Sequence, residues 1–363
     1  MPVAVEPQFK GKAADARPQK VLGKDLFLFS RQLASLLKSG VTILRALGVL
    51  ESQTQNKYFK TVIAQIGLGV KNGRSLSECL STYQEIFSPL YITMVKAGEE
   101  GGNLREMLVN IAIYERKQEE LLSKIRLALA YPLLMLFVGI MTVYFILTFV
   151  LPKMSGLFKN LGDNLPLPTA VLLNLSHSLK ENGIWILLGI VTVIYLLQRL
   201  GQLGKGRVAL SGFFLSLPLF GEIVLKAELS RFTRTLVLLL KGGVPILRAL
   251  EISIPILSNE IIKDDLVKCK QELSAGGSLG ESIKRSPRLP LLLGYLVAVG
   301  EESGSLNEVL TDIADSYEQE TDEKIKLMTT LFEPLMILVV GLVVGFIVFA
   351  MLLPIFQLDV LSN

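Results

Sequence analysis

The stretch FSRQLASLLKSGVTILRAL at residues 29–47 returns as FTRTLVLLLKGGVPILRAL at residues 232–250. Aligned at an offset of 203, the two stretches are identical at 13 of 19 positions. Further along the chain, GRSLSE at Gly73 returns as GGSLGE at Gly276, and GEEGGNL at Gly98 returns as GEESGSL at Gly300. This spacing of about 200 residues is far longer than the repeat of a solenoid. The sequence therefore predicts a duplicated domain.

Each copy is followed by a long apolar segment. Residues 127–151 and 334–356 hold 25 and 23 residues without a charged side chain. At about 1.5 Å per residue, each can cross a hydrocarbon core of about 30 Å as a helix. A third apolar run, residues 183–197, is short enough to be a buried helix instead. Two polar domains on one side of a membrane need an even number of crossings between them, so we predict a second crossing here.

Lys and Arg residues near the crossings predict the orientation. Residues 115–126 carry four such residues and 199–207 carry three, whereas the longer segment 152–182 carries three and the tail after residue 356 carries none. The N-terminus is therefore expected to be cytoplasmic and the C-terminus periplasmic. The expected domains are a mobile N-terminal tail (1–24), a first cytoplasmic domain (25–126), a transmembrane helix (127–151), a periplasmic connection (152–182), a second transmembrane helix (183–198), a cytoplasmic connector (199–224), a second cytoplasmic domain (225–333), a third transmembrane helix (334–356) and a periplasmic tail (357–363).

The fold class predicted for the polar domains is all-α, with about six short helices in each. Apolar residues recur at helical spacing from Phe29 onward, Asp25 is a candidate N-cap, and Gly40 suits a left-handed helix end. Four capping boxes mark further helix starts, and they recur at matching places in the two copies. They are Ser75-x-x-Glu78, Asn103-x-x-Glu106, Ser278-x-x-Glu281 and Ser305-x-x-Glu308.

The last helix of each domain is expected to run directly into the membrane. Pro132 and Pro334 lie at matching places near membrane entry, where a proline can kink a helix. Glu333 lies beside Pro334 at the cytoplasmic edge. In the last crossing, Gly341 and Gly345 form a Gly-x-x-x-Gly pattern that allows close contact between helices.

Nothing in the sequence predicts catalysis, a cofactor or a metal. The chain has one histidine and two cysteines, which do not correspond in the repeat, and it lacks GxxxxGK, HExxH, CxxC and GxSxG motifs. A nucleic-acid role is disfavoured because the basic excess is confined to one copy. Residues 1–126 carry 18 basic and 12 acidic residues, whereas residues 199–326 carry 16 and 17.

The candidate interaction residues are duplicated charges. The basic ones are Arg31, Lys38 and Arg45, with their counterparts Arg234, Lys241 and Arg248; the acidic ones are Glu99, Glu100, Glu301 and Glu302. The lysines can simply form a solvated face, and the acidic pairs could attract a hard cation. Because Arg binds a carboxylate through two parallel bonds, we expect Arg31 to bind Glu99 or Glu100, and Arg234 to bind Glu301 or Glu302.

Taken together, the motifs resemble the inner-membrane platform family of type II secretion systems and type IV pili (the GspF/PilC type). The resemblance spans residues 25–356. The motifs that carry it are FSRQLASLLKSGV, GRSLSECL, MVKAGEEGGNL, the Tyr131-Pro132 entry, LPLP at 165–168, KAELSRFTRTLVLLLKGGVPILRAL, VGEESGSL with YEQE at Tyr317, and the Glu333-Pro334 entry.

The resemblance implies a non-enzymatic platform in the bacterial inner membrane, with type IV pilus biogenesis or protein secretion as its process. Its implied partners are a hexameric assembly ATPase, pilins or pseudopilins, other inner-membrane assembly proteins and further copies of itself. Its membrane helices would help pilin subunits leave the bilayer for the growing fibre. The alternative is a small transporter or channel component, which would need ionisable groups in mid-membrane, where only Glu333 is a candidate. The sequence leaves pilus, secretion and competence systems open.

Overall fold

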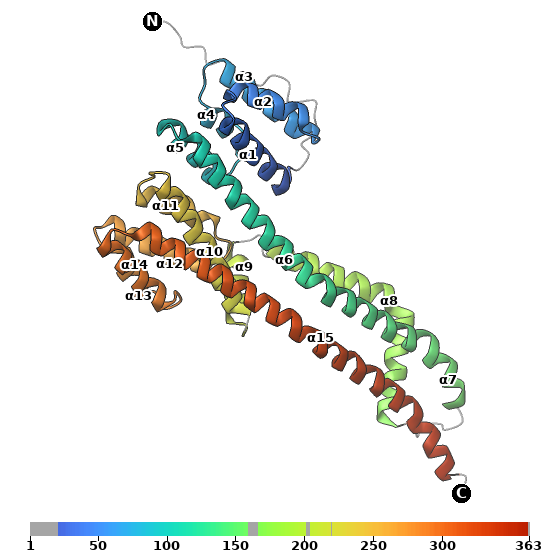
Figure 1. Ribbon diagram of the computed structural model, residues 1–363. Coiled ribbons are helices and arrows are strands. Elements are labelled where there is room, and N and C mark those ends of the chain that lie inside the picture. Colours follow the sequence, from blue (N-terminus) through green and yellow to red (C-terminus); the bar gives the residue numbers. More distant parts are fainter. Residues whose placement is uncertain (1–20, 159–165, 201–203, 219, 362–363) are drawn as a thin grey trace, which may run out of the picture. The chain divides into compact units, whose positions relative to one another are not determined.

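The computed structural model describes residues 21–158, 166–200, 204–218 and 220–361, and these residues form helices and no strands. They belong to two compact units. The first unit contains Met1–Ser123 and Val224–Gln319, so it holds both copies of the repeat. The second contains Lys124–Ile223 and Glu320–Asn363, which include the apolar segments. Two helices, α6 and α15, continue without a break from one unit into the other (Figure 1).

The helices of the two copies follow the same order. In the first copy they are α1 (Gly23–Lys38), α2 (Ile43–Gln53), α3 (Lys57–Lys71), α4 (Leu76–Ser81), α5 (Pro89–Glu100) and α6 (Leu104–Phe145). In the second they are α10 (Phe220–Lys241), α11 (Ile246–Ser253) with the 3₁₀ turn η4 (Ile254–Ile256), α12 (Glu260–Ser274), α13 (Leu279–Arg285), α14 (Leu291–Ser303) and α15 (Leu306–Leu361).

The turns repeat as closely as the helices. Gly40 and Gly243 end the first helix of their copies with φ of 78° and 80°. A side chain would be strained in this left-handed conformation, so glycine is required at both positions. The left-handed glycines in the other described turns also fall in corresponding pairs: Gly73 with Gly276 and Gly102 with Gly304.

Helix starts agree with the sequence in part. Ser75 and Glu78 form the complete capping box of α4, as predicted. At α13, Ser278 caps the Glu281 N–H. The Asp25 prediction was wrong, because α1 begins two residues earlier and Asp25 lies in its first turn, where the carboxylate accepts from the Leu22 N–H at 3.3 Å. An acidic side chain stabilises a first turn from this position as well.

Each copy has an apolar core of its own. In the first copy, aromatic rings from α1, α3 and the α4–α5 segment pack edge to face, with Phe29 and Phe59 centroids 5.5 Å apart. The buried Tyr91 hydroxyl shares a 2.9 Å hydrogen bond with Ser30 at the centre of this core. In the second copy, Phe232 corresponds to Phe29 and is also buried. The predicted apolar stripe therefore builds the core of both copies.

The second unit is built on α6, α8 (Leu167–Leu200) and α15, with the π-helical turn η2 (Ile146–Val150), α7 (Leu151–Phe158) and α9 (Gly204–Ser216). A buried cluster joins η2, α7, α8 and α15 through Leu147, Leu151, Leu172, Ile347, Ala350 and Met351. The Ser176 hydroxyl donates to the Leu147 carbonyl at 2.5 Å, and the Thr169 hydroxyl donates to the Ala350 carbonyl at 2.5 Å. These bonds give the two buried hydroxyl groups a partner within the protein.

Two described helices are long and apolar enough to cross a membrane, those spanning Leu104–Met154 and Leu306–Pro354. A third candidate is the pair α9 and α10, which is bent by 113°. We do not favour this pair, because α10 buries its apolar face, including Phe232, in the core of the second copy. The predicted second crossing, 183–198, lies within α8 and stays a prediction.

The expected connection 152–182 is largely helical. Helix α8 begins at Leu167, inside the LPLP motif, with Pro168 in its first turn, where the missing N–H costs no hydrogen bond. Part of that connection (159–165) and the predicted tail as far as residue 20 lie outside the described residues. The predicted C-terminal tail is helical to Leu361, and 362–363 also lie outside them.

Candidate functional site

The first glutamate of each Gly-Glu-Glu motif binds a neighbouring helix N-terminus. One Glu99 oxygen accepts from the Leu76 N–H at 2.5 Å. The other accepts from the Ser77 N–H at 3.0 Å and from the Ser77 hydroxyl at 2.6 Å. Backbone N–H groups in a first helical turn have no partner within the helix, and the helix dipole favours a negative charge there. Glu99, at the end of α5, therefore holds the start of α4.

The second copy repeats the two backbone contacts at corresponding positions, but its hydroxyl donor comes from the N-cap serine instead of the second helical residue. The Glu301 carboxylate accepts from the Leu279 and Gly280 N–H groups, both at 2.9 Å, and from the Ser278 hydroxyl at 2.6 Å. We call these two contacts the carboxylate latches. They explain why two motifs recur together. GRSLSE and GEEGG occur in the first copy, and GGSLGE and GEESG occur in the second. The sequence contained this signal, since each capped helix start recurs with its glutamate.

The prediction that Arg31 binds Glu99 or Glu100, and Arg234 binds Glu301 or Glu302, was wrong. No such ion pair occurs among the described residues, and backbone N–H groups occupy the latch carboxylates. The second glutamates, Glu100 and Glu302, are exposed. Glu100 lies 3.7 Å from Lys96 in an exposed pair, which contributes little to stability. The described residues contain no group of three or more His, Cys, Asp and Glu side chains that could hold a metal ion.

Arg234 instead joins α10 to α15. Its guanidinium binds Asp315 and also Glu318, the latter at 2.8 Å, and only 15% of its side chain is exposed. Glu318 accepts a second bond, at 2.9 Å, from Lys117 of α6. Lys117 also lies 3.5 Å from Asp315. This charge cluster ties the last helix of the first copy to two helices of the second, within the first unit.

A hydrogen bond between the Thr235 hydroxyl and the Tyr114 hydroxyl, at 3.5 Å, adds to the contact between the copies. Both residues are buried. The sequence did not predict this contact or the charge cluster, because Lys117, Asp315 and Glu318 are not duplicated charges. Their partners are set by how the two copies pack together.

The other predicted basic residues lie on exposed surface. Lys38 and Lys241 are in the last turns of α1 and α10, where a cation suits the helix dipole. Arg45 is exposed on α2, and Arg248 forms an exposed pair with Glu251 at 2.8 Å. The structure does not bring these four residues together, and their role as interaction residues stays a prediction.

Arg31 occupies a different setting from its counterpart. It is exposed, and its guanidinium lies 5.2 Å from the centre of the Phe27 ring. Both side chains line a cavity of about 440 Å³ between α1 and α6, together with Lys24, Arg116, Glu119, Glu120 and Ser123. We call this cavity the α1–α6 groove.

The predicted membrane features lie on α6 and α15. Both helices continue through Pro132 and Pro334 without a break. Tyr131 donates to Glu333 at 3.4 Å, so the two matching membrane entries contact each other. No described atom lies within 4 Å of a Cβ placed on Gly341 or on Gly345, so neither makes a close helix contact among the described residues. Their role in an interface stays a prediction.

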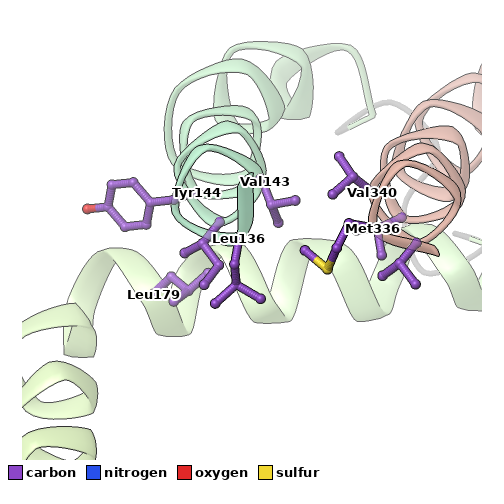
Figure 2. Close-up of a pocket in the computed structure, with 10 residues that line it drawn as sticks. Leu136, Val143, Tyr144, Leu179, Met336 and Val340 are labelled. Carbon is purple, nitrogen blue, oxygen red and sulfur yellow. The ribbon is translucent and has the colours of Figure 1, made fainter. Parts of the chain in front are cut away.

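An apolar cavity of about 340 Å³ lies between α6 and α15 in the second unit. Figure 2 shows Leu136 and Val143 of α6 facing Met336 and Val340 of α15, with Leu179 of α8 on a third side. The lining is otherwise apolar, and the Tyr144 hydroxyl points away from Met336 and Val340 (Figure 2), so no polar group points into the cavity to orient a substrate. The sequence did not predict this cavity.

Comparison with known proteins identifies the family. The chain matches the family described as type II secretion system (T2SS), protein F, at residues 29–152 and again at residues 232–354. The two matches coincide with the two copies of the repeat and together cover more than half of the chain. The chain belongs to this family. The resemblance inferred from the motifs is thereby confirmed.

Curated relatives include both pilus and secretion proteins. A type IV pilus assembly protein PilC of Thermus thermophilus is 37% identical over 336 residues, which cover 92% of this chain and 82% of the relative. A PilC of Pseudomonas aeruginosa is 34% identical, covering 96% of this chain and 94% of the relative. A type II secretion system protein F of Vibrio cholerae is 30% identical, and the match covers 97% of this chain and 88% of the relative. The similarity therefore extends over nearly the full length on both sides.

Proposed function

We propose that this chain is an inner-membrane platform protein of a type IV pilus or type II secretion machine. It would couple a hexameric cytoplasmic assembly ATPase to the insertion of pilin or pseudopilin subunits into a fibre. Membership of the protein F family and the relatives named for pilus assembly and secretion support this assignment. The two long apolar helices agree with a membrane location.

The observation that supports coupling is the continuity of α6 and α15. Each is one unbroken helix that begins in a copy of the repeat and ends in the apolar unit. Because a helix is stiff along its axis, a displacement of a repeat domain would be carried into the membrane segment of the same helix. The charge cluster around Glu318 links the two copies, so they would move together.

The test of coupling measures ATP hydrolysis by the assembly ATPase of the same organism, with and without the full-length protein in lipid nanodiscs. The purified chain should hydrolyse no ATP alone and should change the rate of the ATPase. Lys117→Gln should weaken this effect, whereas Lys60→Gln, a change of equal charge at an exposed site on α3, should not. Intrinsic hydrolysis that survives rigorous purification would reject the platform role.

The proposed topology places the N-terminus in the cytoplasm and the C-terminus in the periplasm, with three crossings. Reporter fusions after residue 24 and within 205–215 should report a cytoplasmic location. Fusions within 160–170 and at Asn363 should report a periplasmic one. A cytoplasmic report from 160–170 would exclude the three-crossing arrangement.

The proposed partners also include other inner-membrane assembly proteins and further copies of this chain. The exposed Gly341-x-x-x-Gly345 face of α15 is the candidate contact for a second copy. Cysteine cross-linking along that face in native membranes would detect a dimer. Cross-links of equal yield all around α15 would indicate random collision rather than an interface.

A further inference from the structure

The α1–α6 groove differs from the corresponding place in the second copy, and the duplication makes the difference informative. At an offset of 203, Arg31 corresponds to Arg234. Arg234 binds Asp315 and Glu318 on α15 and is largely buried. At the offset of 202 that aligns the last helices, those two acidic residues correspond to an isoleucine and to Arg116. The first copy thus has the arginine but neither of the two carboxylate partners.

The two carboxylates that line the groove, Glu119 and Glu120, do not bind Arg31 in place of the missing partners. Glu120 binds Arg116 at 2.6 Å. The Glu119 carboxylate packs against Gly23 at the start of α1, where it offsets the positive end of the helix dipole. Lys24 and Arg31 consequently have no ion-pair partner among the residues that the structure describes.

The two unpaired cations lie on one face of α1, since a separation of seven residues is close to two helical turns. Phe27 lies between them, and its ring faces the Arg31 guanidinium at 5.2 Å, within the range of a cation–π contact. In the second copy, Lys24 corresponds to Ala227 and Phe27 corresponds to Ser230. The Ser230 hydroxyl donates to the Ala314 carbonyl of α15 at 3.1 Å. In that copy the last helix closes directly over small side chains, whereas the first copy leaves an open cationic cavity.

We propose that the α1–α6 groove binds the phosphate of an anionic phospholipid headgroup from the cytoplasmic leaflet. Lys24 and Arg31 would supply the charge, and Phe27 would contact the apolar part of the interface. Ser123, at the end of the groove, precedes the apolar segment 127–151 by only four residues. Even a fully extended chain spans at most about 14 Å over four residues, so the groove is tethered close to the bilayer surface.

One further observation favours a lipid over an acidic protein segment. Leu22, directly before α1, is 59% exposed, which suits an interface where apolar side chains reach acyl chains. Residues 1–126 also carry a net excess of six positive charges, which adds to the attraction of an anionic leaflet. The proposal concerns the anchoring of the first domain and does not rest on the identity of the ATPase or the fibre.

The test titrates the full-length protein, purified in a non-ionic detergent, with a fluorescent short-chain phosphatidylglycerol and follows anisotropy. A phosphatidylcholine analogue is the neutral reference. The protein should bind the anionic lipid more tightly than the neutral one, and less tightly as salt rises. Each cation near a membrane surface contributes about fivefold in affinity, so Lys24→Gln with Arg31→Gln should weaken binding about 25-fold.

Matched variants separate the groove from general charge. Lys60→Gln with Lys71→Gln removes two exposed cations from α3 and should leave the affinity unchanged. Arg116→Glu restores a carboxylate where the second copy has Glu318, and it should abolish the preference for the anionic lipid. Lys24→Arg keeps the charge and should keep the affinity, which would show that binding depends on the charge at this position and not on the lysine side chain itself.

Three outcomes would overturn the proposal. The first is equal weakening by the groove pair and the α3 pair. The second is displacement of the lipid by inorganic phosphate at the same concentration, which would indicate a free-anion site. The third is displacement by a poly-glutamate peptide at a lower concentration than phosphatidylglycerol itself, which would indicate a protein-docking site.

Discussion

Replacing Glu99 by alanine should loosen the start of α4 far more than the same change at the adjacent Glu100. Glu99→Ala removes the acceptor for two backbone N–H groups and one hydroxyl. Each unsatisfied N–H costs about 1–3 kcal/mol, and we take the lower limit because the site is half-buried and admits water. The expected loss is about 2 kcal/mol. Glu100→Ala removes only an exposed pair with Lys96, which contributes about 0–1 kcal/mol.

Hydrogen–deuterium exchange on the full-length protein measures this difference where it arises. A loss of about 2 kcal/mol in local stability raises the exchange rate of the α4 amides, including Leu76 and Ser77, about 30-fold. Glu100→Ala should change those rates by less than about fivefold. Equal rates in the two variants would refute the assignment of Glu99 as the residue that holds α4.

Three further predictions follow from buried groups. Arg234→Ala should destabilise the protein by about 2–3 kcal/mol in chemical denaturation because it removes the largely buried guanidinium that binds two carboxylates and leaves them only Lys117, whereas Arg31→Ala should cost less than about 0.5 kcal/mol; equal losses would contradict the difference between the copies. Burial raises the pKa of the Cys269 thiol to about 11, so about one molecule in a thousand carries the thiolate at pH 8, and Ellman's reagent should react only after unfolding; rapid reaction of the native protein would contradict the burial. Gly280→Ala should lower stability by about 1–3 kcal/mol because its Cβ would lie 2.4 Å from the Ala298 backbone nitrogen, and an unchanged thermal midpoint would contradict this packing.

The sequence predicted the features that depend on local chemistry. Gly40 has the left-handed conformation expected of a helix end, and Ser75 starts α4 with the expected capping box. The apolar stripe that begins at Phe29 was correctly assigned to a helix whose core face is buried. Each of these signals is fixed by a few neighbouring residues, so periodicity and capping chemistry are sufficient to find it.

Partners that are distant in sequence were not predictable in the same way. The pairing of Arg31 with Glu99 or Glu100 was inferred from recurring charges and from the geometry of arginine, but the N–H groups at the start of α4 bind Glu99 instead. The link from Lys117 to Glu318 joins residues about 200 positions apart, on helices that belong to different copies. The π-helical turn at 146–150 was also not predicted, since its sequence, ILTFV, has the composition of any apolar helix.

The two copies show which duplicated residues keep their role. Glu99 and Glu301 make the same backbone contacts, because backbone N–H groups are donors that no substitution except proline removes, whereas their hydroxyl donors lie at different positions. Arg31 and Arg234 make different contacts because their partners would be side chains, and those have diverged. Duplicated charges that bind backbone groups should therefore be structural throughout this family, whereas duplicated charges whose side-chain partners differ between the copies are the places to look for contacts with other molecules. By this reasoning the α1–α6 groove, rather than the carboxylate latches, is where the first copy has acquired a role of its own.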